Sequence, residues 1–304
     1  MLPKPPAREG SLGFLYLPPY RVQGLSVAGE ATSVQVPEID VTFDMGLCPR
    51  AMLASKYVAV THGHMDHVGG LGYWVSQRRF QGMGTGTIIC DKRIEPAMRA
   101  MLEGFHALEQ QQTPFEIIAL EPEQEVEVKN NLFLRGFHTD HTCPSMGYAL
   151  VERRSKLKEE FTDFPQEKLK ELKQRGVEIT RTLQIPLITN TGDTAPGPHL
   201  LREDVRTAQI LITECTFFEP EHNARAKIGK HLHVNDIAEW IRVCTCEAMI
   251  LGHVSRRTHL GYARKRLHEV VAKEHVGRIH FLMDHRVNRE RYEQQLAEAE
   301  NSGA

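Results

Sequence analysis

Three histidines and one aspartate stand within six consecutive positions, in the order His62, His64, Asp66 and His67. These residue types are costly to bury unless they are paired or bind a cation, so a packing role does not explain the cluster. Imidazole nitrogens and carboxylate oxygens suit zinc, and they also admit manganese or iron. The segment therefore predicts a metal site.

The spacing of the four residues favours two metal ions over one. His62 and His64 are two positions apart on a chain that leaves a strand, so they are expected to point the same way and hold one ion. Asp66 and His67 follow where the chain turns toward a helix, and they are expected to face a second ion. Four ligands from one loop cannot complete two sites, so the rest of the chain must supply others.

Further candidate ligands stand where predicted strands end. A short apolar run at 57–60 predicts the strand before His62. Runs at 187–190, 210–213 and 249–251 predict strands that end near Asp193, Glu214 and His253, and His141 stands in a loop before a strand at 147–151. Because the ends of such strands meet at one edge of a sheet, these side chains are expected to converge.

The remaining pattern predicts an α/β protein with a single domain over residues 20–304. Residues 1–19 contain several prolines and are expected to form an irregular extension. Alternating apolar positions predict antiparallel strands between residues 20 and 43, and a hairpin at 126–137 is expected to turn at Asn130-Asn131. Helices are expected at 68–80 and 96–112, at 235–243 with Asn235 as the N-cap, and from residue 286 onward.

The composition excludes several classes of protein. The 304 residues are 41% hydrophobic and carry a net charge of −2, which allows a buried core and excludes a uniformly basic coat for nucleic acid. No signal peptide is evident, and no apolar run approaches the roughly 20 residues that cross a bilayer, so no membrane association is expected. Six scattered cysteines without a CxxC pair indicate reduced thiols in a cytoplasmic protein. Cys244 and Cys246 are either a metal or redox pair or, as we favour, small buried apolar residues.

Residues 152–183 form a charged insertion between two predicted strands. Lysines and arginines are interleaved with acids, and large apolar residues are few. Mixed charge of this kind usually marks a solvated helical face. An insertion between strands can equally project as an arm, and the sequence leaves both interpretations open.

These motifs resemble those of a known family. The order His62-Gly63-His64-Met65-Asp66-His67 matches the HxHxDH motif of the metallo-β-lactamase fold, which implies an αββα sandwich of two mixed β-sheets flanked by helices. Later motifs are similar to those of short-form ribonuclease Z, the tRNA 3′-end processing endonuclease: Phe43-Asp44-Met45-Gly46, His141 seven residues before Tyr148, Gly192-Asp193-Thr194, Glu214-Cys215-Thr216-Phe217, His231-Leu232-His233 and Gly252-His253-Val254-Ser255. Segments 24–29, 43–49 and 172–180 resemble the plant-type enzymes in particular.

Carried over by position, the resemblance implies two zinc ions per subunit, with manganese or iron as alternatives. It assigns His62, His64 and His141 to the first ion, Asp66, His67 and His253 to the second, and Asp193 to a bridge between them. His138 competes with His141 for its role, but the distance of His141 from Gly147-Tyr148 agrees with the family.

The same resemblance implies a zinc-dependent endoribonuclease that removes the 3′ trailer from pre-tRNA and leaves a 3′-hydroxyl. The attacking group would be hydroxide formed between two metal ions. The implied catalytic residues are Asp66, His231 and Glu214. The expected substrate contacts are Tyr148, Arg256, Arg257 and His233, with a structural role preferred for His233. The family is usually homodimeric, so a homodimer is expected.

Two departures from the family keep other functions open. The long glycine-proline arm of many of these enzymes is absent, so residues 152–183 would have to replace it. The segment after His253 lacks the aromatic residue that the family more often has. The alternatives are a phosphodiesterase of small substrates such as cyclic nucleotides, and an RNA-binding scaffold that keeps zinc for structure. Glu214 and His231 argue against the scaffold, because structural zinc needs neither.

Overall fold

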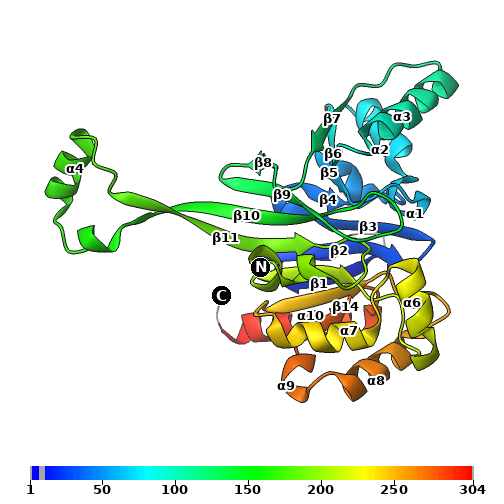
Figure 1. The fold of residues 1–304 in the computed structure, drawn as a ribbon. Helices are drawn as coiled ribbons and strands as arrows, with labels where there is room; N and C mark the ends of the chain where they lie inside the picture. Colours follow the sequence, from blue (N-terminus) through cyan, green and yellow to red (C-terminus); the bar gives the residue numbers. More distant parts are fainter. Residues whose placement is uncertain (1, 7–10, 303–304) are drawn as a thin grey trace.

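The computed structural model describes residues 2–6 and 11–302 of the chain. Two seven-stranded β-sheets face each other, and helices cover their outer faces (Figure 1). The first sheet holds β1 to β7 and the second holds β8 to β14, each in chain order across the sheet. Each half of the chain therefore builds one sheet, and the predicted αββα sandwich is confirmed.

The first sheet begins antiparallel and ends parallel. Its strands are β1 (Gly13–Leu17), β2 (Tyr20–Val27), β3 (Ala31–Val36), β4 (Val41–Phe43), β5 (Tyr57–Val60), β6 (Gly86–Asp91) and β7 (Phe115–Leu120). Strands β1 to β4 pair antiparallel, and β4 to β7 pair parallel. Parallel pairs need crossover connections, and α1 (Met65–Val68), α2 (Leu71–Phe80) and α3 (Glu95–Glu109) lie in those crossovers.

The second sheet follows the same plan. Its strands are β8 (Glu125–Lys129), β9 (Leu132–His138), β10 (Met146–Leu157), β11 (Thr180–Asn190), β12 (Ile210–Glu214), β13 (Ala248–Gly252) and β14 (Ile279–Phe281). Strands β8 to β11 pair antiparallel, and β11 to β14 pair parallel. The later helices are α5 (Glu203–Arg206), α6 (Asn223–Gly229), α7 (Val234–Trp240), α8 (Leu260–Val270), α9 (Lys273–Val276) and α10 (His285–Asn301).

The main core lies between the two sheets. Phe43 and Val41 of the first sheet and Ile188 and Ile250 of the second are fully buried in it. Separate apolar layers lie under the helices, around Trp74 on the first sheet and around Trp240, Ile237 and neighbouring residues on the second. Because both faces of the parallel strands are covered, those strands read as continuous apolar runs in the sequence.

The charged insertion forms an arm. Strands β10 and β11 stay paired beyond the sheet as far as Leu157 opposite Thr180, and α4 (Gln166–Gln174) lies near the tip. Figure 1 shows this hairpin leaving the body of the protein. None of the residues of α4 is buried. The arm and the solvated helix, which the sequence left as alternatives, therefore occur together.

Three sequence-based boundaries are wrong. Irregular structure was expected through residue 19, but β1 pairs with β2, and the ring of Phe14 packs edge-on against Tyr292 of α10 at 5.4 Å between centroids; residues 1 and 7–10 lie outside the described part. The helix expected at 68–80 is two helices, α1 and α2. The N-cap of α7 is His233 instead of Asn235, because the His233 side chain accepts a hydrogen bond from the Asn235 N–H. Among the described residues, no helix combines the length and apolar character needed to cross a bilayer.

Candidate metal centre

The HxHxDH segment follows β5 at the edge where both sheets end. His62 is fully buried, and an isolated bridge pairs it with Ser145 of the loop before β10. Nε2 of His62 lies 3.0 Å from Nδ1 of His64, and Nε2 of His141 lies 3.3 Å from that same atom. The first set of predicted ligands therefore converges. His138 carries an exposed side chain outside this group, within 3.5 Å of Arg93, so the geometry favours His141 over His138.

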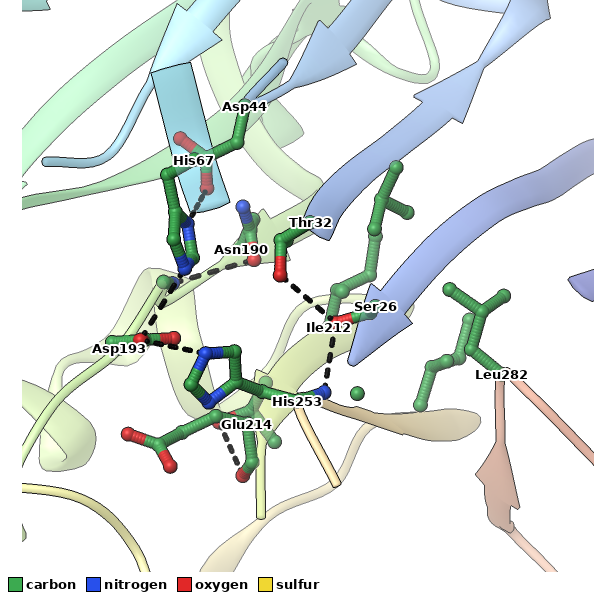
Figure 2. A pocket seen from close by; sticks show the side chains of 15 residues that line it. Ser26, Thr32, Asp44, His67, Asn190, Asp193, Ile212, Glu214, His253 and Leu282 are labelled. Carbon is green, nitrogen blue, oxygen red and sulfur yellow. Dashed lines mark hydrogen bonds and ion pairs between the residues drawn. The ribbon is translucent and has the colours of Figure 1, made fainter. Parts of the chain in front are cut away.

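A second group surrounds the carboxylate of Asp193. Oδ2 of Asp193 lies 3.1 Å from Nε2 of His253 and 3.4 Å from Nε2 of His67. The same oxygen lies 3.9 Å from Nε2 of His62, which belongs to the first group. Oδ2 of Asp66 lies 3.5 Å from Nε2 of His253 and accepts a hydrogen bond from the Gly29 N–H at 2.9 Å. Figure 2 shows His67, Asp193 and His253 pointing toward one another.

The outer nitrogens of the buried imidazoles are held by hydrogen bonds. Asp44 Oδ2 lies 2.8 Å from Nδ1 of His67, and the Thr216 hydroxyl lies 2.9 Å from Nδ1 of His253. Thr61 Oγ1 holds Nδ1 of His62, and the Lys230 carbonyl holds Nδ1 of His141. With Nδ1 occupied, Nε2 of each ring faces the centre, which is the arrangement that outer partners give to metal-binding histidines.

Two buried nitrogens at this centre lie near carboxylate oxygens but make no hydrogen bond. Nε2 of His67 and Nε2 of His253 make no hydrogen bond, although the two residues are only 1% and 4% exposed. An unpaired buried nitrogen is costly, and a cation would satisfy both atoms. Ligand atoms of His62, His67 and Asp193, and of Asp66, His67 and His253, lie within 4.8 Å of one another. The residues present therefore fit one or more metal ions.

The electrostatics of the centre differ from one candidate ligand to the next. Burial, together with the charge of His67, lowers the pKa of His62 to about 2, so its ring stays neutral. Burial opposes the ionisation of Asp193, but the neighbouring His253 and His67 outweigh it and hold the pKa of that carboxyl well below its usual range. Burial lowers the pKa of His67, but the charges of Asp193 and Asp44 outweigh it and raise that pKa well above its usual value. Neutral imidazole and ionised carboxylate are the forms that bind metal, so His67 would release its proton when a cation binds.

His231 and Glu214 form a pair beside the centre. Nδ1 of His231 lies 2.9 Å from Oε1 of Glu214, and its ring stacks on His253 at 5.2 Å between centroids. The Thr194 N–H and the Thr216 hydroxyl donate to the two oxygens of Glu214 at 2.8 and 2.6 Å. Burial lowers the pKa of His231, but the adjacent Glu214 charge and hydrogen bond prevail and raise it to about 9. A protonated imidazole thus stands at the edge of the centre, with 18% of its side chain exposed.

Several backbone positions at the centre have left-handed dihedrals, among them Gly192 and His253. Gly192 has φ 61°, and a Cβ there would lie 2.7 Å from the side chain of Thr61, so the turn that carries Asp193 can approach the first sheet only with glycine. His253 has φ 55°, and its N–H donates to Ser26 Oγ at 2.7 Å. Such strain is tolerated when the surrounding structure fixes a functional side chain.

Of the four expected substrate contacts, Tyr148 is wrong, and His233 has the structural role that was preferred for it. Tyr148 is fully buried between the sheets, and its hydroxyl donates to the Val60 carbonyl at 2.7 Å, because its strand position turns the ring into the core. His233 is 1% exposed and caps α7, so it is structural. Arg256 and Arg257 are exposed, and Arg256 forms an ion pair with Glu30. Their contact with substrate stays a prediction.

The sequence analysis assigned no role to Asp44, Thr216 or Lys230. Asp44 lies in the 43–46 segment, where a polar residue directly after a buried strand was the available signal. Thr216 lies beside Glu214 in the segment that follows β12. The carbonyl of Lys230 contacts His141 through the backbone alone, so no feature of the Lys230 side chain could have revealed it.

A buried centre of histidine and aspartate at the shared edge of an αββα sandwich defines a metal-dependent hydrolase of the metallo-β-lactamase fold. Residues 48–254 match the family described as a β-lactamase superfamily domain. The chain is 33% identical to tRNase Z TRZ2, chloroplastic, of Arabidopsis thaliana over 264 residues, which cover 84% of this chain and 73% of the relative. It is 29% identical to tRNase Z TRZ1 of the same organism, over 83% of this chain and 90% of the relative.

Solved structures agree on the fold. The human short-form tRNase Z superposes with a TM-score of 0.56 at 18% identity, over 81% of this chain and 93% of that one. The metallo-β-lactamase fold protein YhfI of Bacillus subtilis also gives a TM-score of 0.56, at 15% identity, over 89% and 95% of the two chains. Taken with the sequence relatives, these matches mean that the chain belongs to the ribonuclease Z (tRNase Z) family, as its motifs predicted.

Proposed function

We propose that the protein is an endoribonuclease that removes the 3′ trailer from pre-tRNA and leaves a 3′-hydroxyl. The observation that carries the proposal is the Glu214–His231 pair, which lies beside the histidine–aspartate centre at 2.9 Å between Nδ1 and Oε1. A centre that served only structure would need no such pair. The relatives named tRNase Z, at 29 to 33% identity over most of the chain, support the same substrate class.

Seven side chains would hold two divalent ions, for which zinc is the favoured identity. His62, His64 and His141 would hold the first, Asp66, His67 and His253 the second, and Asp193 would reach both. When bound, such ions lower the pKa of a ligated water and neutralise charge on phosphoryl oxygens. Asp66 is held in place by the Gly29 N–H, so its carboxylate can orient the attacking water.

His231 is the proposed proton donor to the departing 3′ oxygen of the tRNA. Its Nδ1 is hydrogen-bonded to Glu214, so Nε2 is the nitrogen that gives up the proton. The pKa of about 9 means that the ring carries that proton at neutral pH. Glu214, fixed by two further donors, orients the imidazole and stabilises its charge.

The arm is the proposed tRNA-binding element. Exposed basic side chains lie along it and around its tip: Lys156, Lys168, Lys170, Lys173 and Arg175. Acidic side chains are interleaved with these residues. Contacts to phosphate supply most of the affinity for nucleic acid, so the exposed lysines and arginine would bind the elbow of a folded RNA. Arg256 and Arg257 would add phosphate contacts near the centre.

A homodimer would bring an arm and a centre together. Figure 1 shows the arm leaving the body on the side away from α1 and α6, which adjoin the candidate ligands. An arm from one subunit would therefore serve the centre of its partner more readily than its own. The exposed apolar side chains Met65, Tyr73 and Phe80 lie on or at the end of α1 and α2 and offer a surface for such a contact. A cytoplasmic location is proposed from the scattered free cysteines.

The proposal is tested by incubating the zinc-loaded protein with a 3′-extended pre-tRNA and mapping both product ends. The expected products are a tRNA with a 3′-hydroxyl and a trailer with a 5′-phosphate, and Asp193→Ala should abolish both. Cyclic AMP and bis(p-nitrophenyl) phosphate serve as comparison substrates. Efficient hydrolysis of cyclic AMP with an intact pre-tRNA would replace the proposal with a small-molecule phosphodiesterase.

A further inference from the structure

The end of β2 and the turn that follows it lie against the loop that carries His253. Ser26 Oγ accepts a hydrogen bond from the His253 N–H at 2.7 Å, and Figure 2 shows this contact. One step further along each segment, an isolated parallel bridge pairs Val27 with Val254, and the Ala28 N–H donates to the Val254 carbonyl at 3.4 Å. The first sheet therefore holds the backbone of a candidate ligand that the second sheet supplies.

The same turn also holds Asp66. The Gly29 N–H donates to Oδ2 of Asp66 at 2.9 Å, and that oxygen lies 3.5 Å from Nε2 of His253. Asp66 and His253 are two of the three residues assigned to the second ion alone. One short segment of the first sheet therefore supports most of the ligands that are specific to that ion.

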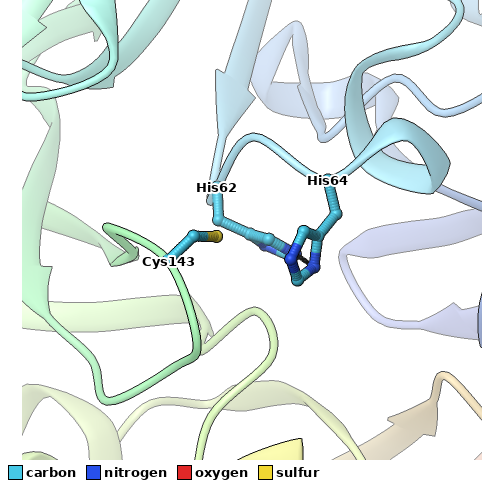
Figure 3. Close-up of side chains that lie close together, drawn as sticks. All are labelled: His62, His64 and Cys143. Atoms are coloured by element: carbon cyan, nitrogen blue, oxygen red, sulfur yellow. Dashed lines mark hydrogen bonds between the residues drawn. The ribbon is translucent and has the colours of Figure 1, made fainter.

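The ligands of the first ion are held by other parts of the chain. Figure 3 shows the rings of His62 and His64 close together within the loop that follows β5. Thr61 Oγ1 holds Nδ1 of His62, and the Lys230 carbonyl holds Nδ1 of His141. A change at the end of β2 should therefore affect the second ion and spare the first.

The backbone of His253 has a conformation that needs support. Its φ of 55° lies in the left-handed region, which is costly for a residue with a side chain. His253 is only 4% exposed, and an unpaired buried N–H is costly, so its N–H depends on the Ser26 hydroxyl. A Cβ on Gly252 would lie 2.5 Å from Ser26 Oγ, which shows how closely the two segments approach. The Ser26 hydroxyl thus stabilises the strained position from which the His253 ring projects.

We propose that Ser26 is a positioning residue for the second ion. Because it fixes the His253 backbone, it places Nε2 of that ring where Asp66 and His67 also converge. Without the hydroxyl, nothing offsets the strain at residue 253, so the ring moves away from the other ligands. The inference rests on the metal centre of the proposed function and is independent of the RNA substrate.

The test is a titration of the full-length, metal-free protein with Zn²⁺ in competition with a chelator, which gives the affinity of each position. His64→Ala, which removes a ligand of the first ion only, identifies which affinity belongs to which position. Ser26→Ala should bind the second ion roughly ten-fold or more weakly, since loss of an outer partner of a ligand costs about 10–100-fold. Its first position should keep native affinity, which also shows that the variant is folded.

Two further variants separate the hydrogen bond from general packing. Ser33 lies on β3 of the same hairpin and is fully buried, but its hydroxyl donates to the Leu47 carbonyl at 2.7 Å. Ser33→Ala is therefore the matched control and should bind both ions with native affinity. Ser26→Thr keeps the hydroxyl and should also bind both ions as the native protein does.

Cadmium NMR of the cadmium-loaded protein adds a second readout. The native protein should give one signal for each position, and Ser26→Ala should shift or broaden only the signal of the second. Equal weakening of both positions would show that Ser26 supports the fold in general, and native affinity at both would show that His253 does not depend on it. Either result overturns the role of Ser26 alone. A native protein that binds no zinc would overturn the metal centre of the proposed function as well.

Discussion

Thr216 accepts a hydrogen bond from Nδ1 of His253 at 2.9 Å between the heavy atoms. It must be the acceptor there, because its own proton goes to Oε2 of Glu214 at 2.6 Å. Glu214 in turn holds His231 through its other oxygen. One buried hydroxyl therefore connects a candidate metal ligand to the proposed proton donor.

Thr216→Val should weaken both ends of this connection. Valine keeps the shape of threonine but removes the hydroxyl, so His253 loses the acceptor that fixes its ring and Glu214 loses a donor. The affinity for zinc, measured by chelator competition, should fall by roughly 10–100-fold. Thr216→Ser should restore most of it. Native affinity in the valine variant would mean that the hydroxyl does not position His253.

His231→Ala should separate metal binding from catalysis. The imidazole gives its proton from outside the proposed ligand set, so zinc content should stay native while the cleavage rate of pre-tRNA falls by about 10²–10⁴-fold. Zinc content is measured by elemental analysis and cleavage by single-turnover assay. His222→Ala, in the neighbouring turn, is the matched control and should cleave normally. Loss of zinc in His231→Ala would place His231 among the ligands.

Removal of the arm tip should weaken the binding of pre-tRNA without changing the hydrolysis of small substrates. Leu157 and Thr180 stand directly opposite each other, so an Asn-Gly turn can replace residues 158–179 and close the hairpin. The KM for pre-tRNA should rise by more than ten-fold because the phosphate contacts are lost. Hydrolysis of bis(p-nitrophenyl) phosphate should stay native. Equal losses on both substrates would show that the tip supports the fold.

His280 on β14 should make stability depend on pH. Burial, aided by the charge of Arg291, lowers the pKa of His280 from 6.5 to about 4. Between these values the unfolded chain binds a proton that the folded chain does not, so the free energy of unfolding falls as the pH drops from 6.5 toward 4. Urea unfolding at pH 7 and pH 5 should therefore differ less in His280→Gln than in the native protein. The exposed His268→Gln should behave like the native protein. An unchanged pH dependence in His280→Gln would contradict the neutral state of the half-buried His280.

The sequence predicted the sandwich and the convergence of ligands because both depend on local patterns. Apolar runs that end in a histidine or a carboxylate mark strand ends, and parallel strands bring their ends to one edge. The direction of a single side chain on a strand depends instead on how that strand is paired. Tyr148 was therefore mistaken for a surface residue, although its ring lies between the sheets and its hydroxyl donates a hydrogen bond to the Val60 carbonyl.

Outer partners of the ligands were harder to predict. Asp44 is separated from His67 by 23 positions, and only the pairing of β4 with β5 brings them to 2.8 Å. The strand β1 was missed for a similar reason. Its five residues are too few for a clear alternation, and its stability comes from β2 and from Tyr292 at the far end of the chain.

The division of the chain into one sheet per half has a consequence for how the centre holds together. The loop after β5 contributes His62, His64, Asp66 and His67 from the first layer, whereas His141, Asp193 and His253 come from the second. Neither sheet alone supplies all the candidate metal ligands. A bound cation would link the two sheets in addition to the apolar core between them, so removal of the metal should lower the free energy of unfolding.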